Sequence, residues 1–254
     1  MRALTWTCVV LVASVLGAAP ASAQKPSRGA AEAGGCITSG SASLGTYFRT
    51  CTTSTGNLIE ITGQSTVTNI STEGYALCAG AMQSVDNSVT SVGFDAPTTS
   101  TPSSNVRTTS DGRFKLSQTF TRDAAEKEIV ITMTVRNQTT APIVGVALAR
   151  FVDADIANSA GLVSYSATKT SIFAHEGYSA DGLSLAARTL NFAVQADIEA
   201  FTDHDPIASG CFTTNAIYPT TPSPSGDWAG WVTYVLGTIN ASASKVVKFV
   251  YRIM

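Results

Sequence analysis

The residue types that could do chemistry gather in two acidic clusters. The first is Asp153-Ala154-Asp155, which ends an apolar segment. Residues two apart in a strand share one face, so both carboxylates could point into one cleft. There they could bind calcium or act as a general acid and base. The alternative is a solvated strand end whose aspartates cap the following turn.

The second cluster surrounds His204, which lies between Asp203 and Asp205. Two flanking carboxylates favour the imidazolium form, and such a histidine could transfer protons. The Asp-Pro pair at 205–206 also starts turns readily, so an exposed loop explains the same residues.

His175 precedes Gly177–Asp181, a stretch that approaches the G-x-S-x-G motif of serine hydrolases. The last glycine is replaced by Asp181, and the motif needs a strand–turn–helix context that this chain does not offer. A polar hairpin loop is the alternative. No catalytic residue is therefore assigned, and Asp153, Asp155, His175 and His204 remain the candidates.

Aromatic residues could form a platform on which a sugar stacks. Trp228 and Trp231 lie three apart in one predicted strand and therefore face opposite sides. Tyr178 lies in a loop. These three residues are the candidate ligand-binding residues, although core packing would also explain them.

The first 23 residues have the pattern of an export signal. Met1-Arg2 gives a positive start, Leu4–Leu16 is an uncharged apolar run, and Ala21-Ser22-Ala23 resembles a signal-peptidase site. We expect a signal peptide over 1–23 and a secreted or periplasmic protein. The run is shorter than the roughly 20 residues that span a bilayer, so no membrane span is expected.

Cysteines support an oxidising compartment. Four remain after cleavage, and an even number in an exported chain predicts two disulfides with three pairings. We favour Cys36–Cys51 and Cys78–Cys211. A zinc site is the alternative, but no C-x-x-C spacing is present. We expect no metal and no cofactor.

Charge argues against nucleic acid as a partner. Loss of Arg2 from the 16 basic residues leaves a net charge of −3 against 18 acidic residues. No basic patch of the kind that binds phosphate backbones is visible.

The hydrophobic period is two along most of the chain. Ile129, Ile131, Met133 and Val135 alternate with polar or β-branched residues. Similar alternation covers 114–120 and 247–253. Short helices are expected only around 76–85 and 196–201.

These patterns predict an all-β protein with about a dozen antiparallel strands and very little helix. A β-sandwich, or a larger supersandwich, is the expected fold, and a barrel is the alternative. We expect a disordered tether over 24–35 and a single sandwich domain over 36–254.

Several segments resemble a group of uncharacterised exported bacterial proteins. They are 111–156, GLSLAARTLNF at 182–192, the Cys211 region, and 231–254. The strand ITMTVRN with its turn and returning strand also resembles the supersandwich of galactose-mutarotase-like proteins. That resemblance implies the fold, and no catalytic residue is carried over from it.

The sequence thus favours an exported, non-enzymatic binding or surface protein, with a glycan or another cell-surface component as partner. A carbohydrate-active enzyme that uses the clustered carboxylates and histidines is the alternative.

Overall fold

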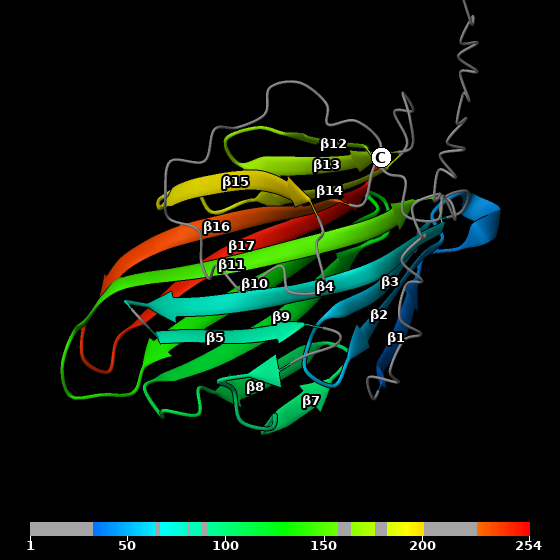
Figure 1. Cartoon of the computed structure of the whole chain (residues 1–254). Helices are drawn as coiled ribbons and strands as arrows, with labels where there is room; N and C mark the ends of the chain where they lie inside the picture. The colour runs from blue at the N-terminus through cyan, green and yellow to red at the C-terminus, as the bar shows by residue number, and fades with distance from the viewer. Residues whose placement is uncertain are drawn as a thin grey trace, which may run out of the picture.

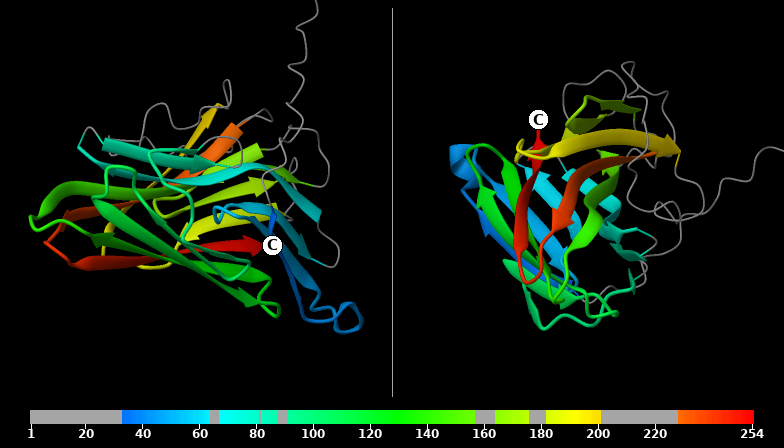
Figure 2. Two further views of the ribbon diagram at one scale, coloured as in Figure 1. Left: turned by 90° about the horizontal axis from the view of Figure 1, so that it is seen from below. Right: turned by 90° about the vertical axis from the view of Figure 1, so that its left-hand side faces the viewer.

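The computed structural model describes residues 33–63, 67–80, 82–87, 91–156, 164–175, 182–200 and 228–254. Within these ranges the chain forms two antiparallel sheets of nine and eight strands, stacked face to face (Figures 1 and 2). The predicted all-β sandwich is confirmed, with 17 described strands in place of the expected dozen.

The nine-stranded sheet runs in the order β1-β2-β3-β4-β11-β16-β15, with β5 pairing with β4 and β6 with β5. Its members are β1 (Ala33–Ser39), β2 (Phe48–Thr53), β3 (Leu58–Gly63), β4 (Val67–Ala79), β5 (Met82–Asn87), β6 (Ser91–Val92), β11 (Ile143–Ile156), β15 (Ala193–Ala200) and β16 (Trp228–Ile239). A short 3-10 helix (Ala42–Leu44) joins β1 to β2.

The eight-stranded sheet runs in the order β12-β13-β14-β17-β10-β9-β8-β7. Its members are β7 (Thr99–Thr101), β8 (Ser104–Thr108), β9 (Phe114–Asp123), β10 (Glu128–Asn137), β12 (Ser164–Ala167), β13 (Ser171–His175), β14 (Gly182–Ala187) and β17 (Ser244–Ile253).

Alternation along the strands builds the core between the sheets. Ile129, Ile131, Met133 and Val135 of β10 are all fully buried there. β17 contributes its own alternate residues, Val247 to Ile253, to the same core. A strand that faces another sheet on one side and solvent on the other needs this two-residue period.

Both short helices expected from the sequence are wrong. Residues 76–79 lie in β4 and 82–85 in β5, which pair as a hairpin. Residues 196–200 lie in β15. These segments are rich in alanine, whose helix propensity is a weak preference that sheet pairing overrides.

β1 begins at Ala33, so the last three residues of the expected tether belong to the sheet. The expected signal peptide lies outside the described residues. Among the residues that the structure describes, no helix has the length and apolar character needed to cross a bilayer.

Candidate functional site

A row of residues in register crosses five strands of the nine-stranded sheet. Cys51 of β2 is in register with Glu60 of β3, Glu60 with Asn69 of β4, and Asn69 with Asp155 of β11. Cys36 of β1 continues the row on the other side of Cys51. We call Cys36, Cys51, Glu60, Asn69 and Asp155 the polar row.

The polar row occupies the outward register positions of these strands. Ile61 of β3 and Ala154 and Ile156 of β11 pack in the core between the sheets. Successive strand residues alternate between faces. The positions of Glu60 and Asp155 are therefore on the face of the nine-stranded sheet that points away from the core.

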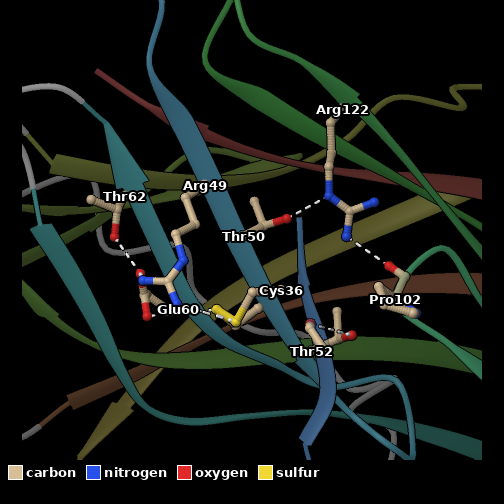
Figure 3. The surroundings of a disulfide bond; sticks show 10 residues. Cys36, Arg49, Thr50, Thr52, Glu60, Thr62, Pro102 and Arg122 are labelled. Carbon is tan, nitrogen blue, oxygen red and sulfur yellow. Dashed lines mark hydrogen bonds and ion pairs between the residues drawn. A yellow bond between two sulfur atoms is a disulfide. The ribbon is translucent and has the colours of Figure 1, made fainter. Parts of the chain in front are cut away.

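Glu60 is held by two neighbours on this face (Figure 3). Arg49 Nη1 donates to Glu60 Oε1 at 2.9 Å, and Thr62 Oγ1 donates to the same oxygen at 2.8 Å. The side chains of Arg49 and Glu60 keep 38% and 25% of their surface exposed. Both are thus ordered by each other and still reachable by a ligand.

A disulfide adjoins this ion pair, and it confirms one predicted pairing. Cys36 and Cys51 are bonded across β1 and β2. Arg49 Nη2 lies 3.4 Å from Cys36 Sγ, and Glu60 Oε2 lies 3.6 Å from Cys51 Sγ. Cys78 is disulfide-bonded too. Its predicted partner, Cys211, lies outside the described residues, so that pairing stays a prediction.

The predicted carboxylate pair lies on β11, with Asp155 in the polar row and Asp153 next to it along the strand. A register shift separates Asp153 from Ala154, where β4 has one extra residue. The Ala154 amide at this bulge donates to the hydroxyl of Tyr165, at 2.8 Å, from the facing sheet. Asp153 is only 3% exposed.

His175 does not join these carboxylates. It ends β13 in the other sheet, where Ile172 and Ala174 pack in the core and His175 takes the opposite register position. Its ring stacks on Phe173 with the centroids 5.2 Å apart. Asp153 and His175 therefore lie on opposite outer faces of the sandwich. His204 lies outside the described residues.

Trp231 lies on the same outer face as the polar row, beside Phe151 of the neighbouring strand. Their ring centroids are 6.1 Å apart, and both rings sit in a small apolar cluster with alanines. Trp231 is 3% exposed, so its indole offers a sugar little surface. Trp228 begins β16, and Tyr178 lies outside the described residues.

Sequence reasoning missed a buried ion pair inside the sandwich. Arg150 of β11 and Glu73 of β4 are both fully buried, and their closest charged atoms are 2.6 Å apart. Tyr251 of β17 donates to Glu73 at 2.6 Å, and Gln118 of β9 accepts from Arg150 at 2.7 Å. Burial raises the pKa of Glu73, although Arg150 and these donors oppose that shift.

A second buried pair lies toward the β5 edge. Asp86 binds the guanidinium of Arg107, which comes from β8 in the other sheet. Asn57 donates to Asp86 at 2.6 Å, and Arg107 donates to the hydroxyl of Tyr75 at 3.2 Å. Burial raises the pKa of Tyr75, and the charge of Asp86 adds to that effect.

These buried groups hold the turn between β2 and β3. Arg150 donates to the Gly56 carbonyl, Tyr75 donates to the Thr55 carbonyl, and Glu73 accepts from the Leu58 amide. All of these hydrogen-bond partners are groups of the protein itself. The Glu73–Arg150 and Asp86–Arg107 pairs therefore hold the turn in place and connect the two sheets. The sequence did contain a signal, because Gln118 and Arg150 occupy core positions in otherwise apolar alternation.

Within the described ranges, no three histidine, cysteine or acidic side chains converge in the way that a metal site requires. On this outer face, the cluster Arg49–Glu60–Thr62 instead offers a guanidinium, a carboxylate and a hydroxyl. The strand positions of Asn69 and Asp155 continue the register of Glu60.

No family model matches the chain. No curated protein matches it at a significant level. Solved structures of 48 chains are similar to it, including the following three. A bacterial glucoamylase in complex with acarbose matches with a TM-score of 0.58 at 12% identity, over 87% of this chain and 32% of that chain. The chain thus spans about a third of the length of that enzyme.

The other two are similar at lower scores. A polysaccharide lyase gives a TM-score of 0.45 at 11% identity, over 79% of this chain and 31% of that chain. A galactose mutarotase related enzyme from Lactobacillus acidophilus gives 0.37 at 7% identity, over 86% of this chain and 97% of that chain. At these identities, what the comparisons establish is the fold: this chain has a large β-sandwich similar to one part of the glucoamylase.

Proposed function

We propose that the protein is an exported, non-enzymatic binding protein that takes a glycan at the polar row. The observation that carries this proposal is the partly exposed Arg49–Glu60–Thr62 cluster, whose row continues in register to Asn69 and Asp155. Sugar hydroxyls both donate and accept hydrogen bonds, and this cluster supplies the donors Arg49 and Thr62 and the acceptor Glu60.

Rigidity supports a binding role for this cluster. Arg49 and Glu60 lie on neighbouring strands and hold each other at 2.9 Å, so little side-chain freedom is lost when a ligand arrives. Sites built on strands hold their geometry better than sites built on loops. The disulfide beside them is compatible with an extracellular or periplasmic location.

The similar solved structures agree with a carbohydrate connection without assigning one. They are a glucoamylase bound to acarbose, a polysaccharide lyase and a galactose mutarotase related enzyme. Only the first has a similarity that supports the fold comparison, and this chain spans 32% of it.

A glycan array probed with the mature chain tests the proposal. We expect binding to at least one glycan, and a loss of about tenfold or more in affinity for Glu60→Gln and for Arg49→Gln, because each removes a charge-assisted hydrogen bond to the ligand. The matched control is Glu126→Gln, which removes a carboxylate from another exposed ion pair, with Arg252. Absence of binding to every glycan would overturn the proposal.

A carbohydrate-active enzyme is the second candidate, and one observation favours it. Glu60 and Asp155 lie two strands apart, and two spacings of about 4.8 Å put their backbones roughly 10 Å apart. Inverting glycosidases use two carboxyl groups about 6.5–9.5 Å apart, and the positions of Glu60 and Asp155 share one face of the sheet, so this pair is the candidate for such chemistry. Release of reducing sugar from a bound glycan, abolished by Asp155→Asn, would replace the binding proposal with this one.

A further inference from the structure

The two sulfurs of the Cys36–Cys51 disulfide differ in access. Cys36 is exposed on β1, which lies at the edge of the sheet, whereas Cys51 is 2% exposed on β2. A thiol must approach one sulfur along the axis of the disulfide, so access decides which sulfur it attacks. Cys36 is therefore the half of the disulfide that a thiol in solution reaches more readily.

The two sulfurs also differ in charge environment (Figure 3). Arg49 Nη2 lies 3.4 Å from Cys36 Sγ, so a cation faces the sulfur that solvent reaches. Glu60 Oε2 lies 3.6 Å from Cys51 Sγ, so a carboxylate faces the covered one. An incoming thiolate is therefore attracted toward Cys36 and repelled from Cys51.

We propose that Cys36 is a site of S-thiolation, at which a small thiol such as reduced glutathione opens the disulfide and stays on Cys36 as a mixed disulfide. The thiolate forms a new bond to Cys36 Sγ, the bond between Cys36 and Cys51 breaks, and its electron pair leaves on Cys51 Sγ. Cys51 then takes a proton from water. The small thiol is oxidised and Cys51 is reduced.

Glu60 slows the re-closing of the Cys36–Cys51 bond and so lengthens the lifetime of the mixed disulfide. Glu60 Oε2 lies 3.6 Å from Cys51 Sγ. After the disulfide opens, a carboxylate at that distance would disfavour a second negative charge on Cys51 and would accept a hydrogen bond from its protonated thiol. Only a thiolate attacks a disulfide, so a Cys51 thiol held in its protonated form re-closes the bond slowly. The same carboxylate slows the opening step, because Cys51 is then the leaving group.

Peptide mapping of the full mature chain after incubation with reduced glutathione tests the site. We expect the glutathione adduct on Cys36 in at least about tenfold excess over Cys51, with Cys78 as an internal comparison in the same digest. An adduct mainly on Cys51, or thiolation of Cys78 while Cys36 stays unmodified, would overturn the proposal.

Two substitutions test the charge argument separately from the site. Glu60→Gln should speed both the opening of the disulfide and the loss of the adduct by a few-fold. Arg49→Gln should slow attack by the glutathione thiolate, which also carries carboxylates, more than attack by the singly charged thiolate of 2-mercaptoethanol, whereas Arg49→Lys should retain the wild-type ratio. Rates equal to wild type in both Gln variants would contradict the charge argument. The readout is the mass of a peptide, so it is independent of glycan binding.

Discussion

Glu73 and Arg150 show what a single charged residue does inside this sandwich. Neither side chain reaches solvent, and each satisfies the other while holding the turn between β2 and β3. A buried ion pair is costly to form, but removing one partner leaves the other charge unpaired in the core. These residues therefore matter for stability through their pairing.

Replacing Glu73 with Gln should lower the free energy of unfolding by about 3–5 kcal/mol, measured by urea denaturation, because Arg150 is left as an uncompensated buried charge. The double variant with Arg150→Met should lose less than the sum of the two single losses, since it removes both charges. Glu126→Gln, in an exposed pair, is the control and should cost less than about 1 kcal/mol. Equal losses at Glu73 and Glu126 would contradict this account.

Buried tyrosines make stability depend on alkaline pH. Burial raises the pKa of Tyr75, Tyr234 and Tyr251 above the ordinary value of 10.0. In the unfolded chain these phenols ionise near pH 10, so the folded state binds more protons above that pH. Their contribution is therefore complete below about pH 10 and is lost as the pH rises further.

Urea unfolding between pH 8 and pH 11 measures this effect, with a decline expected above about pH 10. Tyr251→Phe should make the decline less steep, because one of the three phenols no longer titrates. A decline of equal steepness in the variant would show that Tyr251 ionises as freely in the folded state as in the unfolded chain.

The sequence could have revealed these interior polar residues, but not the polar row. Gln118 and Arg150 stand in phase with apolar neighbours, so alternation alone marks them as core positions. Glu60 and Arg49 carry no such signal. Their importance comes from a register that joins distant strands, and a linear pattern does not contain that register.

Among the strands, β16 and β13 belong to different sheets and approach each other closely at Gly230. A Cβ built on Gly230 would lie 2.2 Å from Ile172 Cδ1, and the other near atoms belong to the same isoleucine. The absence of a side chain at Gly230 thus lets the two sheets approach at this point.

Gly230→Ala should lower the free energy of unfolding by about 1–3 kcal/mol, because the added methyl overpacks a closed core. The second variant Ile172→Val removes the clashing Cδ1 atom. We expect Gly230→Ala/Ile172→Val to be more stable than Gly230→Ala alone by chemical denaturation. A double variant that is no more stable would indicate that the glycine is needed for its backbone rather than for space.

Alanine residues account for the helices that were wrongly predicted from the sequence. Ala76, Ala147, Ala149 and Ala229 lie on the outer face of the nine-stranded sheet, around Phe151 and Trp231. Small residues there let the two large rings pack on the sheet. Of these alanines, only Ala76 lies in a segment for which the sequence predicts a helix, and the pairing of β4 with β11 overrides the local propensity there.

At the scale of the whole molecule, the fold class followed from the two-residue period, and Cys36–Cys51 followed from cysteine parity and proximity. The stacking of nine strands on eight could not be predicted from the sequence, because alternation alone does not say which strands are neighbours. Polar links between the sheets complete the architecture: Arg107 with Asp86, Tyr251 with Glu73, and Arg122 with Thr50. The charged interior thus supports the fold, whereas recognition at the polar row is the proposal made above.

Affinity for a glycan, measured by isothermal titration with wild type, Glu60→Gln and Glu126→Gln side by side, tests the central claim most directly. Wild type and Glu126→Gln should bind a glycan selected on the array with equal affinity. Glu60→Gln should bind it at least about tenfold more weakly while unfolding at the same urea concentration. Equal affinity in all three proteins would contradict recognition at the polar row.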